Sequence, residues 1–195
     1  MTPRIRLAAP ADAAAINDIY NYYVPRSTCT YQEEPEPLAA RVSWLAAKGP
    51  EHPVTVAEAE GRVVGWGCLT TFRARSAYRY TCEDSLYVHH ALHGRGIGAA
   101  ILADLVARAR ALGYRAIIAG IDAEQPVSIR LHARQGFVEV GRLPQVGYKF
   151  GRWLDVVFME LLLPDGGPEV GGAASVTPAR APAARPGDGP MCANQ

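Results

Sequence analysis

A glycine-rich loop between an expected strand and an expected helix constrains this chain more than any other feature. The apolar run that ends at Val88 is typical of a strand, and the apolar periodicity of 97–109 predicts an amphipathic helix. Gly94, Gly96 and Gly98 lie between them and leave the backbone N–H groups unobstructed. Because a helix N-terminus presents N–H donors and the positive end of its dipole, the loop predicts an anion site suited to phosphate.

The order of the segments predicts a single mixed α/β domain. One strand precedes two helices, three strands, a helix, a strand, a helix and two final strands. Residues 1–163 carry this pattern, whereas residues 164–195 are rich in Gly, Pro, Ala and Arg and are expected to form a disordered tail. The strands are expected at 5–7, 54–57, 62–69, 80–88, 115–121, 137–140 and 156–162, and the helices at 10–24, 38–48, 97–112 and 126–135.

Local signals support several of these bounds. Glu60 and Gly61 form a dipeptide typical of a hairpin turn between two strands. Asp104 and Arg108 are spaced for a favourable ion pair on the surface of the long helix. Gly113 suits the left-handed position that follows a helix C-terminus. Strand, turn and helix assignments therefore agree across the middle of the chain.

Composition excludes several classes of partner. The formal net charge is +1 and no basic run stands out, which argues against nucleic-acid binding. No apolar run is long enough to span a membrane, and the first residues lack the apolar core of a signal peptide. The four cysteines form no CxxC pair and are interpreted as reduced thiols. A cytoplasmic protein without nucleic-acid or membrane partners is expected.

The glycine loop and four further stretches resemble a known family. The motif at 93–98 is similar to the Gln/Arg-x-x-Gly-x-Gly/Ala motif of the GNAT superfamily of N-acetyltransferases. The stretches 73–78, 82–88, 128–137 and 145–156 resemble its phosphinothricin and methionine sulfoximine (sulfone) acetyltransferase branch. The resemblance covers about residues 3–163. It implies a mixed, mostly antiparallel sheet flanked by helices, acetyl-CoA as acetyl donor, an amino-acid acceptor, no metal and a homodimer.

The resemblance also implies which residues hold CoA. The glycine loop is expected to cradle the pyrophosphate, and the backbone of the preceding strand to pair with pantetheine. His93 stands where the family usually has Gln or Arg. Gln125 stands where Asn is common, and Gln is a poorer helix cap than Asn. These departures are expected to affect CoA affinity rather than the reaction class. The expected CoA contacts are Leu86, Tyr87, Val88, His93, Gly94, Arg95, Gly96, Ile97, Gly98, Ala99, Gln125 and Ser128.

Glu83 and His132 are the expected catalytic residues. An amino-acid ammonium must lose a proton before it attacks a thioester, and a carboxylate beside it can accept that proton. Glu83 matches the carboxylate proposed for this task in the family, and burial is expected to raise its pKa. His132 has two open interpretations: it protonates the leaving thiolate, or it only hydrogen-bonds a neighbour. No cysteine matches a family nucleophile, so direct attack in a ternary complex is expected.

Basic residues before the glycine-loop strand are candidates for binding the acceptor. Arg73 and Arg75 could clamp carboxylate or phosphinate oxygens, although exposed arginines are more often simply solvated. Tyr31 and Tyr87 could line the acceptor pocket or belong to the core. The expected acceptor contacts are Tyr31, Arg73, Ala74, Arg75, Tyr78, Glu83, Asp84, Ser85 and Tyr87.

Alternative functions remain open at this point. The acceptor could be another small amine or a protein amine, although Arg73 and Arg75 argue against a cationic one. A CoA-binding module with weak or no catalysis is a further alternative, favoured only by His93 and Gln125. His89, His90 and His93 lie close in sequence, but their spacing lacks the helical register and matching ligands of a metal site.

Overall fold

The computed structural model describes residues 3–168 of the chain. The order of helices and strands predicted from the sequence is confirmed. Three short 3-10 turns, Pro10–Asp12, Ser76–Tyr78 and His90–Leu92, connect these elements. The strands are β1 (Arg4–Leu7), β2 (Val54–Ala59), β3 (Arg62–Thr71), β4 (Thr81–Val88), β5 (Ala116–Asp122), β6 (Val138–Lys149) and β7 (Arg152–Leu162), and the helices are α1 (Ala13–Tyr23), α2 (Leu38–Ala46), α3 (Ile97–Ala111) and α4 (Pro126–Arg134).

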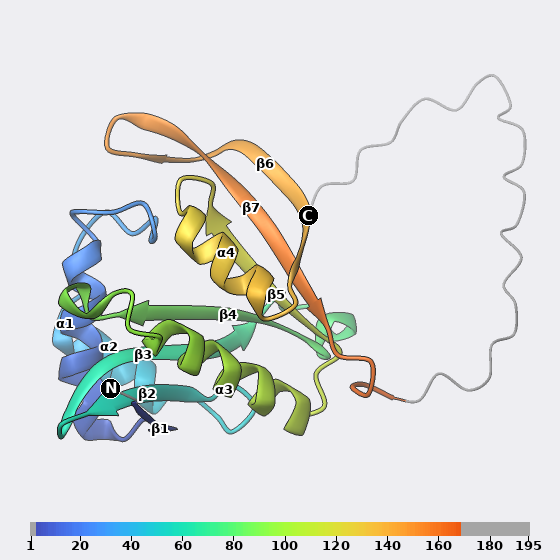
Figure 1. Ribbon diagram of the computed structural model, residues 1–195, viewed down its shortest axis with the longest axis horizontal. Coiled ribbons are helices and arrows are strands. Elements are labelled where there is room, and N and C mark those ends of the chain that lie inside the picture. The colour runs from blue at the N-terminus through green and yellow to red at the C-terminus, as the bar shows by residue number, and fades with distance from the viewer. Residues whose placement is uncertain (1–2, 169–195) are drawn as a thin grey trace, which may run out of the picture.

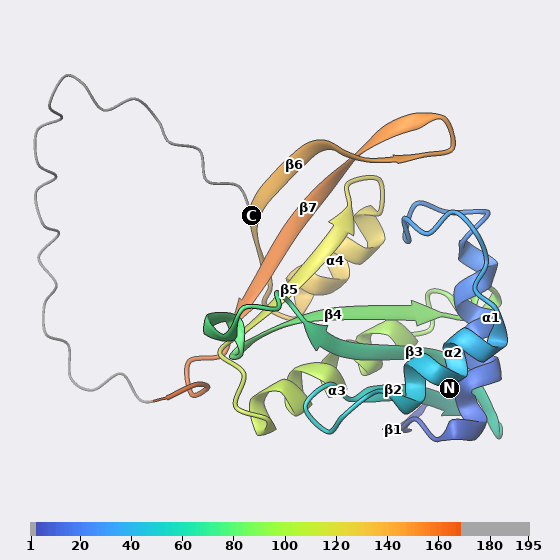
Figure 2. The same cartoon turned by 180° about the vertical axis from the view of Figure 1, so that it is seen from behind.

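The seven strands form one sheet in the order β1-β2-β3-β4-β5-β7-β6. Every neighbouring pair is antiparallel except β4 and β5, which run parallel. Helices α3 and α4 cover the face seen in Figure 1, and α1 and α2 cover the opposite face, seen in Figure 2. The expected mixed, mostly antiparallel sheet flanked by helices is therefore confirmed.

The parallel pair opens part-way along its length. Strands β4 and β5 are in register only where 81–83 pair with 116–118. Beyond Glu83, β4 stays paired with β3 as far as Val88, which lies opposite Gly65. On the side of β5 the two strands diverge, as Figure 1 shows. The sheet therefore contains a V-shaped gap whose closed end lies at Glu83, and the backbone of 84–88 faces this gap.

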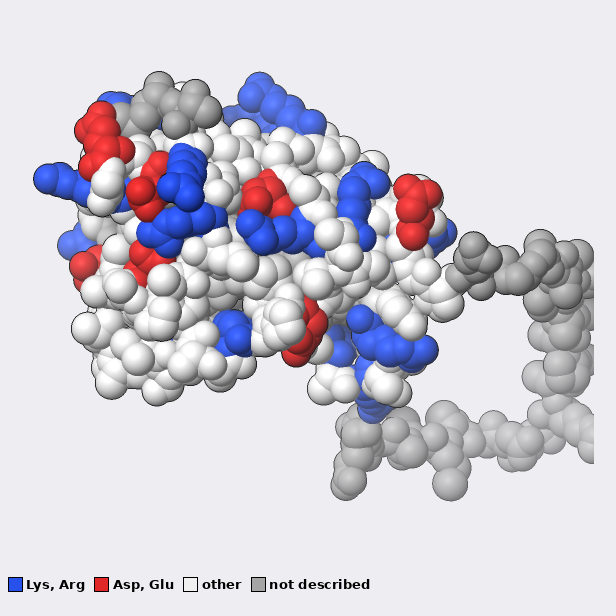
Figure 3. Space-filling view, turned by 90° about the horizontal axis from the view of Figure 1, so that it is seen from below, with Lys and Arg blue, Asp and Glu red and all other residues white. Residues whose placement is uncertain are grey.

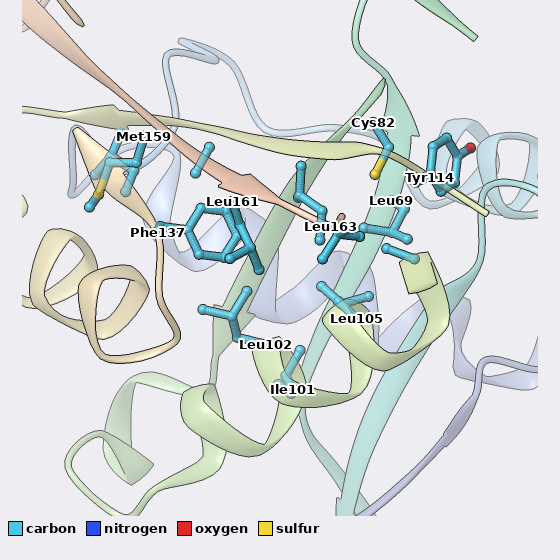
Figure 4. Packing of buried hydrophobic residues seen from close by; sticks show 14 of the residues in the cluster. Leu69, Cys82, Ile101, Leu102, Leu105, Tyr114, Phe137, Met159, Leu161 and Leu163 are labelled. Atoms are coloured by element: carbon cyan, nitrogen blue, oxygen red, sulfur yellow. The ribbon is translucent and has the colours of Figure 1, made fainter. Parts of the chain in front are cut away.

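Helix α3 packs its apolar stripe onto the sheet. Ile97, Ile101 and Leu105 are fully buried, as the helical periodicity of the sequence predicts. Figure 4 shows Ile101, Leu102 and Leu105 directed at the sheet beside side chains of the later strands. A Cβ on Gly67 of β3 would lie 2.6 Å from Ile101 Cγ2, so this glycine permits the close approach of the helix. The packing fixes the helix whose N-terminus carries the glycine loop.

Helix α2 buries a charged residue and exposes apolar ones. Leu38 and Val42 are 47% and 45% exposed. Arg41 is buried instead, with its guanidinium stacked against the aromatic rings of Tyr20, Trp44 and Trp66. The start of the apolar stripe therefore faces outward, whereas Trp44 and Leu45 pack against the core, and the cation–π contacts of Arg41 add to this attachment.

The final hairpin is longer than the sequence pattern predicts. Strands were expected at 137–140 and 156–162, and that expectation is wrong in extent because β6 and β7 continue to a tight turn at Phe150-Gly151. The register shifts at 139–141 and 143–147. These irregularities accommodate residues that interrupt the alternation, Pro144 among them, without ending the strand.

The last described residues pack against the domain. Gly166 N–H donates to Leu163 O, Gly167 N–H donates to Gly113 O, and the Arg115 guanidinium contacts the Pro164 carbonyl. The expected tail starts at 164, so its first five residues are ordered here, and 169–195 lie outside the described residues.

The surface of the described chain shows no one-sided charge on the face in Figure 3, where basic and acidic side chains are interspersed. Within residues 3–168, no helix has the length and apolar character required to cross a membrane.

Candidate active site

A cavity of about 80 Å³ lies in the gap between β4 and β5. It is lined by residues 84–87 of β4, residues 119–122 of β5, and His132 with its neighbours in α4. Cys29, from the loop between α1 and α2, closes one side. The gap is thus a walled cleft that crosses the sheet, bounded by backbone on two sides.

A larger groove, of about 470 Å³, lies elsewhere. Residues of β1, α2 and the C-terminal end of α3 form it, including Val42, Leu45 and Leu112. None of the expected catalytic or binding residues lines it, and it is remote from the glycine loop. Its size alone therefore does not make it the candidate site.

The glycine loop has the geometry expected of an anion cradle. Gly94 and Gly96 have φ of +74° and +79°, the left-handed region that favours glycine, and Gly96 caps α3. Ala100 N–H makes the first helical bond, to Gly96 O, so the preceding amides of the first turn have no helical carbonyl. The α3 first turn carries no acidic side chain. The loop therefore offers unpaired donors to an anion.

His93 does not face this cradle in the way that a Gln or Arg donor would. Its Nε2 lies 2.6 Å from the Tyr23 hydroxyl oxygen, and that hydroxyl lies 2.5 Å from Val88 O. Tyr23 has one proton, which the Val88 carbonyl requires, so His93 Nε2–H donates to the tyrosine oxygen. His93 therefore attaches the loop to α1 and to the end of β4.

Glu83 lies at the closed end of the cleft. Its side chain is half-buried, and its Oε1 lies 3.3 Å from the position that a Cβ on Gly120 would occupy. Burial, and then the negative charge of Asp84, raise the pKa of the Glu83 carboxyl above its usual value. The expected rise in pKa is thus present, and it moves this carboxyl toward the range useful for a general base.

Asp84 and His132 form a buried pair on the other face of β4. His132 Nε2 lies 3.1 Å from Asp84 Oδ2, and Nδ1 lies 2.8 Å from Ser128 O. Burial opposes the charged imidazole, but the Asp84 carboxylate and the Ser128 carbonyl outweigh it, and the pKa of His132 is raised. Asp84 Oδ1 is buried without a hydrogen-bond partner among residues 3–168. Alternation along the strand separates Asp84 from Glu83, although both are expected acceptor contacts.

The expected acceptor-binding arginines lie outside the cavity lining. Arg73, Arg75 and Tyr78 belong to the exposed connection between β3 and β4, and Arg73 stacks on the Phe72 ring. This connection begins after Thr71, which pairs with Cys82 next to Glu83. The structure therefore places it at the closed end of the cleft, the end where Glu83 lies.

The loop between α1 and α2, residues 24–37, forms one wall of the cleft. Tyr31 Oη donates to Asp122 Oδ2 at 2.8 Å, and Gln125 Nε2 donates to Thr28 Oγ1 at 3.1 Å. Gln125 makes no side-chain cap bond to α4 and holds the loop instead. Lys149 Nζ donates to two carbonyls of the same loop.

Sequence reasoning did not identify Cys29, Asp122 or Lys149. Burial lowers the pKa of Lys149, while the nearby Cys29 and Glu33 oppose that change. A lysine at the end of a strand whose other residues are mostly exposed has no local signal that it is buried.

A metal site is not evident among residues 3–168, where no group of three or more His, Cys, Asp or Glu is placed to hold an ion. His90 stacks on Tyr22 and on His89.

The site fits the donor that the sequence motifs imply. A cradle of unpaired N–H groups suits a pyrophosphate, and the unpaired strand edge 84–88 suits an amide chain such as pantetheine. The unpartnered Asp84 Oδ1 also leaves an acceptor beside the cleft. The residues present therefore fit acetyl-CoA.

Comparison with known proteins agrees with this geometry. The L-methionine sulfoximine/L-methionine sulfone acetyltransferase of Salmonella typhimurium is 41% identical over 160 residues, 82% of this chain and 94% of that protein. A phosphinothricin acetyltransferase from Sinorhizobium meliloti, solved with acetyl-CoA, is 39% identical with a TM-score of 0.82, covering 91% and 98% of the two chains. A ribosomal-protein-alanine N-acetyltransferase from Brucella melitensis is 43% identical with a TM-score of 0.80, covering 82% and 99%. The profile of the acetyltransferase (GNAT) family matches residues 16–137, more than half of the chain. The chain therefore belongs to the GNAT family of acetyltransferases.

Proposed function

We propose that this enzyme transfers the acetyl group of acetyl-CoA to the α-amino group of a small amino-acid-like acceptor: phosphinothricin, L-methionine sulfoximine or L-methionine sulfone. The observation that carries the proposal is the position of Glu83, half-buried at the closed end of the cleft with a raised pKa. The acceptor class follows from relatives named for these substrates, at 38–41% identity.

Glu83 acts as the general base. Acetyl-CoA supplies the acetyl group as an activated thioester. Glu83 accepts a proton from the acceptor ammonium, directly or through a water, so that the neutral amine can attack within a ternary complex. Burial raises the pKa of the Cys29 thiol in the cavity wall, and Cys68 and Cys82 are buried, so these thiols are poor nucleophiles. Direct attack is therefore favoured over an acetyl-enzyme.

His132 holds Asp84 and supplies positive charge to the cleft. Both of its ring nitrogens have protein partners, which supports the interpretation that it hydrogen-bonds its neighbours. As an imidazolium in the cavity lining it also stabilises the leaving thiolate and is the nearest source of a proton for it.

Arg73, Arg75 and Tyr78 bind the second polar group of the acceptor. Their connection begins beside the strand pair that positions Glu83, and guanidinium groups suit carboxylate, phosphinate and sulfoximine oxygens. A protein N-terminus is the second candidate acceptor, because the Brucella melitensis relative is named for a ribosomal-protein alanine.

The enzyme acts as a homodimer in this proposal. The β6–β7 hairpin exposes apolar side chains at Val140, Val146, Tyr148 and Trp153, which favours burial against a second copy. A cytoplasmic location is supported by the free thiols at Cys29, Cys68 and Cys82. Sedimentation equilibrium tests the dimer, and a monomer at micromolar concentration contradicts it.

A thiol-release assay tests the function. The panel contains phosphinothricin, methionine sulfoximine, methionine sulfone, an alanine-terminated peptide and a polyamine. Turnover of the first three at the highest kcat/KM is expected. Tight acetyl-CoA binding in calorimetry without turnover of any acceptor contradicts the proposal and favours a CoA-binding module.

A further inference from the structure

Among the described residues, Lys149 is the largest side chain that is completely buried, with 1% of its surface exposed. An ammonium group in such a place is costly unless several acceptors surround it. Within residues 3–168 no carboxylate forms an ion pair with it. Its Nζ donates instead to Ser27 O at 2.9 Å and to Thr30 O at 2.6 Å, and lies 4.9 Å from the centre of the Phe150 ring. Lys149 thus holds backbone, and this backbone belongs to the wall of the cleft.

The positive charge of Lys149 stabilises the close approach of the two carbonyls that it binds. Ser27 and Thr30 lie on either side of Thr28 and Cys29, and the chain curves so that both carbonyl oxygens converge on one point. Converging carbonyl dipoles repel each other, and their burial strengthens that repulsion. Removal of the ammonium therefore favours a different path for residues 27–30.

Strand β6 makes a second contact with the same loop. A Cβ on Gly147 would lie 2.3 Å from Cε2 of Tyr31, so the bare backbone at this position lets the tyrosine ring pack flat against the strand. The ring then extends to Asp122, which lines the cavity. The end of β6 thus fixes both the backbone of the loop and its aromatic side chain.

We propose that Lys149 is a positioning residue for acceptor recognition. By joining the Ser27 and Thr30 carbonyls it sets the place of Cys29 and Tyr31 in the cleft wall, and thereby determines which acceptor side chains fit. The glycine loop, expected to hold the pyrophosphate, is not among the groups that Lys149 Nζ contacts. Thr28, between the two bound carbonyls, meets an expected CoA contact only through its hydrogen bond with Gln125, so the larger effect falls on the acceptor. The proposal deepens the proposed function and rests on it for the identity of the acceptor.

The first test compares Lys149→Met with Lys48→Met. Lys48 is the only other lysine of the sequence and stacks on Trp44, remote from the cleft. We expect Lys149→Met to raise the acceptor KM about tenfold or more, since a shift of about 1 Å in a positioning group can cost up to 10²-fold. The KM for acetyl-CoA should change by a smaller factor, since only the Thr28–Gln125 hydrogen bond links this loop to an expected CoA contact. A loss confined to kcat, or an equal rise in both KM values, overturns the proposal.

The second test does not depend on turnover. Cys29 lies between the two bound carbonyls, so its alkylation by iodoacetamide, located by peptide mass spectrometry, reports the position of the loop. We expect Lys149→Met to speed its labelling about tenfold at equal thiolate fraction, as a local opening made easier by about 1.4 kcal/mol would. The comparison is made at equal thiolate fraction because burial raises the pKa of the Cys29 thiol and the Lys149 charge opposes that rise. Lys48→Met should label like the wild type. Unchanged labelling at Cys29 in folded Lys149→Met overturns the proposal, even if the wild type uses none of the amino-acid acceptors and the proposed function fails.

A third pair keeps the lysine in place. Gly147→Ala should displace the Tyr31 ring and raise the acceptor KM, whereas Gly141→Ala on the same strand meets nothing within 4 Å and should behave like the wild type. This pair of variants tests the proposal if circular dichroism shows that Lys149→Met is unfolded. Equal acceptor KM values for the two alanine variants then overturn the proposal.

Discussion

His132 Nε2 lies 3.1 Å from Asp84 Oδ2, and the protein buries both side chains. Since Nδ1 donates to the Ser128 carbonyl, a neutral ring would turn a lone pair toward the carboxylate. The pair is therefore stable only with a proton on each nitrogen, or with the proton shared with Asp84. A buried charge pair thus lies beside the cleft that we propose binds the thioester.

Asp84→Asn should destabilise the fold in a pH-dependent way. The folded pKa of His132 is raised, so its contribution is fully present below the unfolded pKa and is lost as the pH rises through the folded pKa. We expect a loss of about 1–3 kcal/mol in the free energy of unfolding at pH 6, the range for a hydrogen bond to a charged group. Urea unfolding at pH 6 and pH 9 should show that the difference shrinks at the higher pH.

The matched control is Asp104→Asn. It breaks the pair of Asp104 with Arg108 on the surface of α3, at 2.7 Å. We expect a loss of only about 0.3–0.5 kcal/mol, because exposed helix pairs contribute little. An equal loss in both variants would mean that the Asp84–His132 pair contributes no more than a surface pair.

Glu83→Gln should remove the acidic limb of the pH–rate profile, in which the rate rises with pH. Proton acceptance requires the carboxylate, so kcat/KM of the wild type should rise with pH through a pKa above the usual value for Glu. The variant should lose about 10²–10⁴ in kcat, the usual contribution of a general base. Steady-state rates from pH 5 to 9 check both statements.

Glu60→Gln, in the exposed turn between β2 and β3, is the control for charge and should keep the wild-type profile. A Glu83→Gln variant with the wild-type rate and pH profile would show that Glu83 is not the general base.

Gly96→Ala should weaken acetyl-CoA binding. Its φ of +79° costs an L residue about 1–2 kcal/mol, and relaxation of that strain redirects the amides of the α3 N-terminus. Gly61→Ala is the control, since its φ of +73° carries similar strain in a turn remote from the cleft. Unfolding experiments should show similar destabilisation of both variants, and calorimetry should show a lower acetyl-CoA affinity for Gly96→Ala alone. Equal affinities would remove the loop from donor binding.

Features of the fold that depend on residues close together in the sequence could be predicted from it. The stripe of α3, the Asp104–Arg108 pair and the turn at Glu60-Gly61 depend on residues within four positions, and the structure confirms each. The length of β6 escaped prediction because bulges hide its alternation. Glu83 and the glycine loop were identified through motifs.

The wall of the cleft could not be predicted in the same way. Lys149 contacts Ser27 and Thr30 about 120 positions earlier, and Tyr31 reaches Asp122 91 positions later. No periodicity or spacing in the sequence links such residues, because only the tertiary fold brings β6 to the loop after α1.

Tyr23→Phe should loosen the junction between α1, the end of β4 and the glycine loop. The hydroxyl lies 2.5 Å from Val88 O and 2.6 Å from His93 Nε2, so its removal leaves these two groups only the longer contact of 3.4 Å with each other. We expect a loss of about 1–2 kcal/mol in the free energy of unfolding. Because His93 belongs to the loop that we propose holds the donor, we also expect weaker acetyl-CoA binding. Tyr22→Phe is the matched control, since the Tyr22 ring stacks on His90 and its hydroxyl makes no hydrogen bond within the described chain. Urea unfolding and calorimetry on both variants check the prediction, and equal acetyl-CoA affinities would show that His93 holds the loop without help from Tyr23.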